Sequence, residues 1–141
     1  EGFNDEDTIN FILRFVQTID YKIDNYTTYA GIEEYPKYPI EMLWDEQGDC
    51  EDAANLFSSL MEALGYETVF LLVGVSMSSS EEINRMNHAM IGISFSGGSG
   101  QYFEFQGDSN YYFLSETTSP GSITGSPGWA QIELFYVYYV D

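Results

Sequence analysis

Apolar residues recur at helical spacing in two segments of the first half of the chain. In residues 5–18 they return every three or four positions behind an acidic first turn, which predicts an amphipathic helix. The apolar residues of this segment are Ile9, Ile12, Leu13, Phe15 and Val16. A second apolar face consists of Cys50, Ala53, Ala54, Phe57, Leu60, Met61 and Leu64. Asp49 is a suitable N-cap and Gly65 a suitable helix-ending glycine, so a second helix is predicted over residues 50–64.

After Gly65 the pattern changes to short runs of β-branched and aromatic residues, which are typical of strands. The runs cover residues 68–75, 89–95, 101–105, 110–115 and 131–140. Gly107-Asp108 lies between two aromatic runs and predicts a hairpin turn. Helices followed by antiparallel strands predict an α+β fold.

The remaining segments have few regularly spaced apolar residues and are predicted to be connections. Residues 20–43 contain Pro36 and Pro39 among Tyr, Asn and Gly, and are expected to form an extended loop that ends in a short turn. Residues 76–85 are a polar connection, and residues 119–128 are a loop rich in Pro, Gly and Ser.

A length of 141 residues suits one domain, which we predict over residues 1–141. Within it, residues 1–43 are the first helix and the Tyr/Pro loop, 44–118 the core with the candidate site, and 119–141 a loop and C-terminal strand. No apolar stretch approaches the roughly 18 residues that span a bilayer, so no membrane insertion is expected within this segment. The sequence leaves the oligomeric state open.

The charge balance narrows the partners that the chain can bind. Twenty-three acidic residues against four basic ones give a net charge of −19. Nucleic-acid binding is not expected, because it needs clustered Lys and Arg. The charge is compatible with calcium, but no helix-loop-helix calcium motif is present, and no cofactor is predicted.

Cys50 is the only cysteine, so an internal disulfide and a zinc site built from several thiolates are excluded. It lies in the first turn of a predicted helix, where free N–H groups and the helix dipole favour a thiolate and could stabilise an oxyanion. His88, the only histidine, begins the run 89–95 and could take the proton of the thiol. A carboxylate would then be needed to orient its ring.

Two features near Cys50 complicate this interpretation. Asp49, Glu51 and Asp52 flank the thiol, and nearby negative charge disfavours a thiolate. Either those side chains point away, two of them capping helix N–H groups, or an imidazolium-thiolate pair supplies the stabilisation. Trp44 and Gln47 are candidates for a second hydrogen-bond donor to an oxyanion, although packing of the Trp ring and a turn at Gln47 explain them as well.

Several motifs taken together resemble the transglutaminase-like superfamily of cysteine hydrolases, and in particular its archaeal branch. They are EYPKYPIE (34–41), GDCEDA (48–53), LGY (64–66), HA (88–89), YYFLSETT (111–118) and ITGSP (123–127). The resemblance implies a papain/transglutaminase-like core, in which the helix that carries the Cys packs on an antiparallel sheet. It also implies attack of the Cys on an amide or peptide carbonyl to form a thioester, with Cys50 as nucleophile, His88 as base and Glu116 as acid.

The third residue of this triad is open between Glu116 and Asp108. The superfamily more often has Asp followed by Pro-Thr, closer behind the His, whereas here an extra aromatic hairpin intervenes. If the strands after His88 follow one another as a meander, Asp108 lies at the His88 end of the sheet. If residues 101–105 are an excursion, Glu116 returns beside His88.

The expected function is a cysteine-dependent hydrolase or acyltransferase that acts on a peptide or protein amide. The alternative is a catalytically inactive transglutaminase-like domain that serves as a binding module. The sequon Asn25-Tyr26-Thr27 and a first residue other than Met lead us to expect an exported or membrane-tethered domain.

Overall fold

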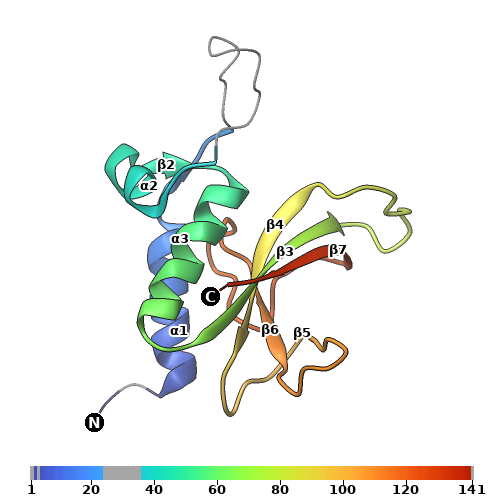
Figure 1. The fold of residues 1–141 in the computed structure, drawn as a ribbon. Helices are drawn as coiled ribbons and strands as arrows, with labels where there is room; N and C mark the ends of the chain where they lie inside the picture. The colour runs from blue at the N-terminus through green and yellow to red at the C-terminus, as the bar shows by residue number, and fades with distance from the viewer. Residues whose placement is uncertain (1, 3, 24–35, 141) are drawn as a thin grey trace.

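Three helices lie beside a curled antiparallel sheet in the computed structural model, which describes residues 2, 4–23 and 36–140 (Figure 1). The helices are α1 (Asp5–Gln17), α2 (Pro39–Asp45) and α3 (Cys50–Ala63). The strands are β1 (Asp20–Tyr21), β2 (Gln47–Gly48), β3 (Glu67–Ser76), β4 (His88–Ser94), β5 (Tyr102–Phe103), β6 (Tyr112–Ser115) and β7 (Gln131–Tyr139). The sequon at Asn25 lies outside the described residues. The predicted α+β fold, with a helix packed on an antiparallel sheet, is confirmed.

Both long helices begin and end as their capping residues predict. In α1 the side chain of Asn4 accepts a hydrogen bond from the backbone N–H of Asp7 at 2.8 Å. Asp49 is the N-cap of α3, and Gly65 follows this helix with a φ of 91°, which glycine adopts without strain.

The helix α2 corrects the prediction of an extended loop that ends in a short turn. Pro39 occupies the first turn, where its missing N–H costs nothing, and the Glu41 carboxylate accepts a hydrogen bond from the Tyr38 N–H at 2.7 Å. Met42 of α2 is buried and packs in the same core as α3. This burial stabilises a helix of only seven residues.

The main sheet has the strand order β5-β6-β4-β3-β7, so β5 is an excursion rather than a step in a meander. The strand β6 pairs directly with β4, and Ser115 lies opposite Ile91. The strands β5 and β6 are shorter than the runs 101–105 and 110–115 predicted. The turn between them is centred on Gln106-Gly107 rather than Gly107-Asp108, since the N–H of Asp108 donates to the carbonyl of Phe105 at 3.0 Å.

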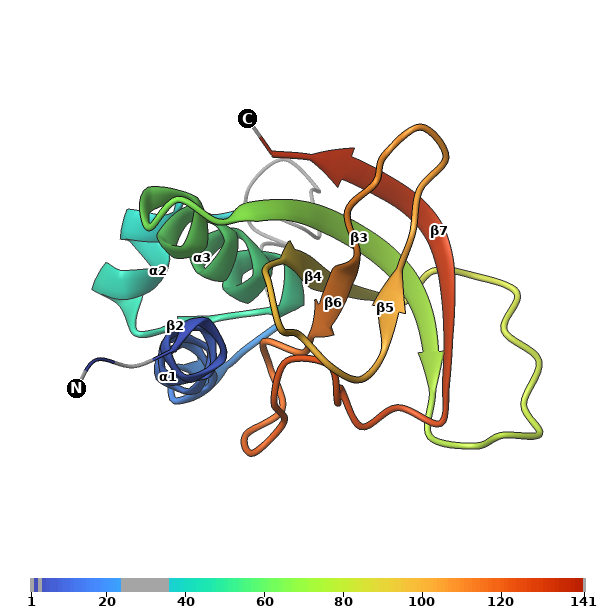
Figure 2. The same cartoon turned by 90° about the horizontal axis from the view of Figure 1, so that it is seen from below.

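The sheet separates two hydrophobic cores. On one face, α1 and α3 pack on alternate residues of β4, namely Ala89, Ile91 and Ile93. On the other face the sheet curls around the core that contains Met90 and Leu114 (Figure 2). Because successive strand residues point to opposite faces, His88 shares the concave face with Met90, and Glu116 shares it with Leu114.

The curl brings aromatic rings together at one end of the sheet. There the rings of Phe105 and Tyr139 lie 6.2 Å apart, and those of Tyr112 and Tyr139 lie 6.3 Å apart. His88 lies at the opposite end of the sheet, because it pairs with Val73 whereas Tyr139 pairs with Val69 on the same strand. The concave face is therefore closed by aromatic rings at the end distant from His88.

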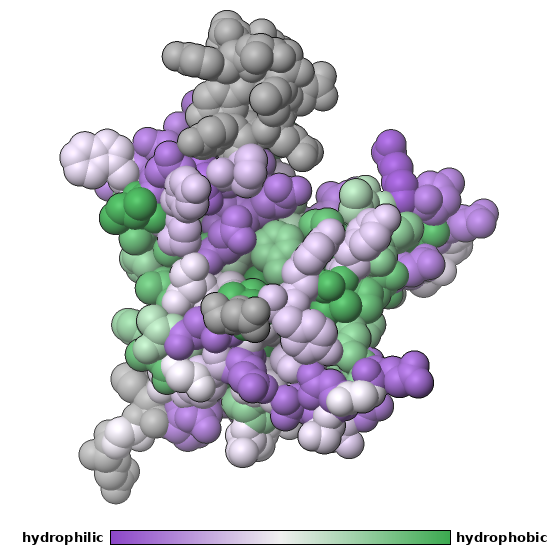
Figure 3. All heavy atoms as spheres, viewed as in Figure 1, coloured by the Kyte–Doolittle hydropathy of each residue, from purple (hydrophilic) through white to green (hydrophobic). Residues whose placement is uncertain are grey.

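Hydrophilic residues cover much of the outer surface, including the long β3–β4 connection at the right of Figure 3. This distribution accommodates the net charge of −19 on the solvated side of the molecule. Among the described residues, no helix is both long enough and apolar enough to span a bilayer.

Candidate active site

Cys50 is the first residue of α3, and a close approach of the preceding chain places it there. The short strand β2 ends at Gly48, which pairs with Tyr21 of β1. A side chain at Gly48 would place its Cβ 2.8 Å from the Cβ of Asp52, which is too close for any residue except glycine. The chain therefore passes tightly behind the first turn of α3 and leaves Cys50 half-buried at its start.

The acidic residues beside Cys50 are held largely by backbone N–H groups. One carboxylate oxygen of Asp49 accepts from the N–H groups of Glu51 and Asp52, at 3.0 and 3.2 Å. Asp52 is 1% exposed and accepts from the N–H groups of Lys37 and Asp49, at 2.8 and 3.1 Å. Two of the three carboxylates thus accept hydrogen bonds at the start of α3. This is the arrangement considered from the sequence in which two of the acidic side chains cap helix N–H groups.

His88 is joined directly to Glu116. The His88 Nε2 lies 2.6 Å from the Glu116 Oε2, and the carboxylate is fully buried. The same carboxylate oxygen accepts from the Trp129 Nε1–H at 2.7 Å. Its other oxygen accepts from the backbone N–H and the hydroxyl of Thr118, at 2.9 and 2.7 Å. The donors around Glu116 fix the carboxylate and, through it, the orientation of the imidazole.

Asp108, the other candidate for this position, lies elsewhere. Its carboxylate accepts from the Tyr112 hydroxyl at 2.8 Å and from the Asn110 N–H at 2.9 Å, at the aromatic end of the sheet. Because β5 is an excursion, β6 runs antiparallel to β4 and returns Glu116 to the end of the sheet where β4 begins. Of the two carboxylates, the structure brings Glu116 to His88 and leaves Asp108 away from it.

The neighbours of His88 favour its protonated form. Burial lowers the pKa of His88, but the hydrogen bonds with Cys50 and Glu116 and the negative charge of both raise it to about 9. Burial also opposes ionisation of Glu116, yet its hydrogen bonds and the charge of His88 hold the pKa below its ordinary value. Since Nε2 faces Glu116, Nδ1 is the ring nitrogen left for the thiol.

We expect the single histidine to titrate with a midpoint near 9 rather than 6.5, and its one Cε1–H signal in the proton NMR spectrum measures this directly. Because the folded-state pKa is raised, the protonated ring stabilises the fold fully below pH 6.5, and this contribution is lost as the pH rises through 9. It amounts to on the order of 3 kcal/mol of unfolding free energy.

A His88→Gln variant is the control for the unfolding measurement, since glutamine at position 88 does not titrate, whereas every other group that titrates in this range is shared by both proteins. As the pH rises from 6.5 to 9.5, the free energy of unfolding of the native protein, measured with urea, should decline relative to that of the variant. Parallel curves for the two proteins would contradict the raised pKa.

Four residues near the site were not identified from the sequence. The Trp129 ring lies 5.4 Å from the imidazole of His88, and the Gln17 side chain donates to the backbone carbonyl of Glu116 at 2.8 Å. Burial, then the charges of Cys50, Asp49 and Glu116, raise the pKa of Tyr21. Tyr21 and Thr118 line a cavity of about 520 Å³ beside the site. Only Thr118 had a signal in the sequence, as part of the SETT motif.

The two candidates for a second oxyanion donor have separate outcomes. Trp44 lies on α2 with 86% of its surface exposed, so the expectation that it packs in the interior is wrong. Gln47 is in β2 rather than in a turn, and its backbone carbonyl accepts from the Lys37 ammonium at 3.0 Å. Among the described residues, no hydrogen bond uses the backbone N–H of Cys50, which leaves that donor for a ligand.

The described residues do not form a metal site. Within residues 4–23 and 36–140, no group of three or more His, Cys, Asp or Glu side chains could hold a metal ion.

Comparisons with known proteins agree with the fold and with the resemblance stated from the sequence. Residues 1–112 match a family described as a transglutaminase-like domain. No curated protein sequence matches the chain.

Solved structures of LapG from Legionella pneumophila have a similar fold. The calcium-bound form is 18% identical, with a TM-score of 0.57 over 92% of this chain and 62% of its own. Another LapG structure is 17% identical, with a TM-score of 0.56 over 94% and 64% of the two chains. A candidate cysteine protease from Cytophaga hutchinsonii has a TM-score of 0.48 at 13% identity, over 94% and 42%. The chain thus spans less than two thirds of the LapG chains, and the likeness is one of fold.

Proposed function

Because the chain belongs to the family of transglutaminase-like domains, we propose that it is a cysteine-dependent hydrolase or acyltransferase that acts on an amide or peptide bond. Cys50 is the nucleophile, His88 the acid-base group and Glu116 the residue that orients and charges the imidazole. The substrate is a peptide or protein amide, and the proposed steps use only groups of the chain itself, without a cofactor.

The observation that carries this proposal is the position of the His88 ring between Cys50 and Glu116. The ring lies 2.6 Å from the Glu116 carboxylate, and Cys50 is close enough to contribute to the raised pKa of His88. A nucleophile, a base and a group that orients the base form the arrangement that covalent acyl transfer needs. A raised pKa of about 9 supports a protonated His88 imidazole at neutral pH.

The first half of the reaction is acylation of Cys50. Its sulfur attacks the substrate carbonyl carbon, and the oxyanion that forms accepts a hydrogen bond from the Cys50 N–H at the start of α3. The imidazolium of His88 then gives its proton to the leaving amine as the carbon–nitrogen bond breaks. A thioester remains on Cys50, and His88 is neutral.

The second half returns the enzyme to its starting state. Neutral His88 takes a proton from a water molecule or from an acceptor amine, whose oxygen or nitrogen attacks the thioester carbon. The carbon–sulfur bond breaks, and Cys50 leaves as a thiolate beside the imidazolium. Glu116 stabilises this imidazolium throughout, because its buried carboxylate accepts the ring N–H.

The experiment that tests the proposal uses p-nitrophenyl acetate with the native protein. We expect a burst of p-nitrophenolate of about one equivalent per chain, with a mass increase on Cys50 that corresponds to one acetyl group. The control is the same protein pretreated with iodoacetamide, which blocks the only thiol in the sequence. No burst, with an unmodified Cys50, would favour the alternative of a binding module without activity.

A further inference from the structure

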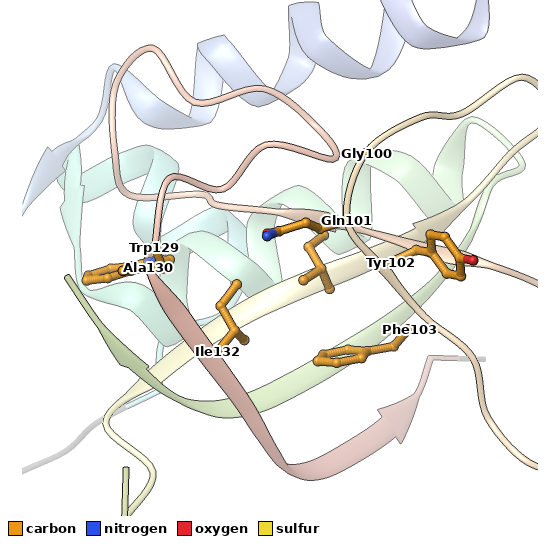
Figure 4. A pocket seen from close by; sticks show the side chains of 8 residues that line it. Gly100, Gln101, Tyr102, Phe103, Trp129, Ala130 and Ile132 are labelled. Atoms are coloured by element: carbon orange, nitrogen blue, oxygen red, sulfur yellow. The ribbon is translucent and has the colours of Figure 1, made fainter. Parts of the chain in front are cut away.

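The concave face of the sheet contains a cavity that extends from Trp129, beside His88, to Tyr102 and Phe103 of β5. Its volume is about 340 Å³, and it is lined by Gly100, Gln101, Tyr102, Phe103, Leu114, Trp129, Ala130 and Ile132 (Figure 4). None of these residues is charged, and four of them have large apolar or aromatic side chains close to the core inside the curl. The chemistry of the cavity therefore suits apolar side chains.

The two rims of this cavity are the two edges of the same sheet. Tyr102 and Phe103 form β5, whereas Ile132 belongs to the beginning of β7, and these strands are first and last in the order β5-β6-β4-β3-β7. Within the described residues, neither strand pairs with another on its outer side. Unpaired strand edges bind extended peptides through main-chain hydrogen bonds, with pockets for alternate side chains.

Trp129 connects the cavity to the proposed triad. Its ring lines the cavity and lies 5.4 Å from the His88 ring, and its Nε1–H donates to the carboxylate oxygen that His88 contacts. His88 exchanges protons with the leaving amine and with an acceptor amine, so both amines must reach this ring. Trp129 is therefore shared by the cavity and the surroundings of His88.

We propose that the cavity between β5 and β7 binds the amine side of the reaction, as an extended peptide with apolar side chains next to its amino group. The proposal rests on the proposed function and adds which part of a substrate is recognised. The leaving segment and the acceptor amine use one site, because the two half-reactions are the reverse of each other at His88. The net charge of −19 attracts the protonated amine to this surface.

The test measures how acetylated Cys50, formed from p-nitrophenyl acetate, divides between water and two acceptor amines. Glycinamide offers an amine alone, whereas glycyl-leucyl-phenylalaninamide adds two apolar residues that reach the cavity. The nitrogen of the acceptor forms the new amide and its proton passes to His88, while the carbon–sulfur bond breaks and Cys50 is released as the thiolate. We expect the native protein to prefer the tripeptide amide by at least about tenfold, since one or two buried apolar side chains supply this much.

Two substitutions fill the cavity from its opposite rims. Gln101→Trp changes an exposed side chain and is expected to leave the fold intact, and Ile132→Trp repeats the test from β7. Each should reduce the preference to about that for glycinamide. Tyr136→Trp is the matched control on β7, because Tyr136 is 54% exposed and does not line the cavity, and it should keep the preference.

The outcomes separate this inference from the proposed function. A native protein without preference, or a preference that persists in both cavity variants, overturns the inference although acetylation succeeds. If no acetylation occurs, the proposed function fails. Binding of the peptide in the cavity can still be tested by tryptophan fluorescence of a Trp44→Phe variant, in which Trp129 is the only tryptophan. A saturable change in Trp129 fluorescence with the tripeptide amide, and none with glycinamide, supports the inference about the cavity. No change with the tripeptide amide overturns the inference. A cavity covered by a second copy of the chain would likewise show no such change.

Discussion

Replacement of His88 by alanine is expected to lower the rate of acetylation of Cys50 by a factor on the order of 10⁵. The imidazole is the only group of the described site that lies between the thiol and a carboxylate, and the sequence contains no other histidine to replace it. Without it the thiol loses both its base and its paired cation. The measurement is the single-turnover rate of p-nitrophenolate release at pH 7.

Loss of the base can be separated from loss of the thiol in this variant. Complete alkylation of Cys50 under denaturing conditions counts the thiol, and partial recovery of the rate by added imidazole shows that the missing function is proton transfer. Cys50→Ala is the matched control, which reports the direct reaction of imidazole with the ester and should show no acetylation beyond it. A His88→Ala protein that keeps more than about a tenth of the native rate would contradict the assigned role.

The sequence was sufficient to predict the element that carries Cys50. Helical spacing of apolar residues, the N-cap Asp49 and Gly65 all agree over residues 50–64, and α3 covers nearly the same range. Agreement of several local signals is what specifies a helix. The start of β4 at His88 could also be predicted from the sequence, because the apolar run 89–95 begins directly after His88.

The choice between Glu116 and Asp108 depended on strand pairing, which the sequence does not encode locally. Both residues follow aromatic runs of similar composition, and either could end a strand beside His88. The order of the strands is decided by long-range packing: the side chains of Tyr112 and Leu114 fill the inside of the curl, and this places β6 against β4. Only then does the chain beyond Ser115 reach His88.

Trp129 was missed for a related reason. It follows a loop rich in Pro and Gly and precedes the last strand, and nothing in that segment indicates a partner elsewhere in the chain. Its role appears only when β7 pairs with β3 and the curl of the sheet brings its ring to His88 and its Nε1–H to Glu116. Residues that orient a catalytic group from a distant strand leave no local periodicity to detect.

The acidic residues beside Cys50 carry charges that the sequence alone marks as unfavourable for a thiolate, and backbone N–H groups stabilise two of these charges. Asp49 caps α3, and Asp52 accepts N–H groups from two segments of the chain. Their charge is stabilised by these donors, so it serves the start of the helix. The cationic neighbour that a thiolate needs is then supplied by His88, whose pKa is raised to about 9.

Glu116→Gln is the second substitution with a large expected effect, and it should lower the acetylation rate by about 10³- to 10⁴-fold. All four groups that contact the Glu116 carboxylate are donors or can donate: His88, Trp129 and two groups of Thr118. The amide nitrogen of glutamine would face a donor in either orientation. It would therefore turn the imidazole from its position or select the wrong tautomer.

The same substitution has a second readout that a change in stability alone would not produce. Loss of the negative charge removes part of what raises the pKa of His88, so the NMR midpoint of the imidazole should move down from about 9 toward 6.5. Asp108→Asn is the control, because Asp108 is hydrogen bonded to Tyr112 at the distant end of the sheet, and both the rate and the midpoint should stay at their native values. A larger loss of rate in Asp108→Asn than in Glu116→Gln would reverse the assignment, and it would require a pairing of β4 and β6 other than the one observed.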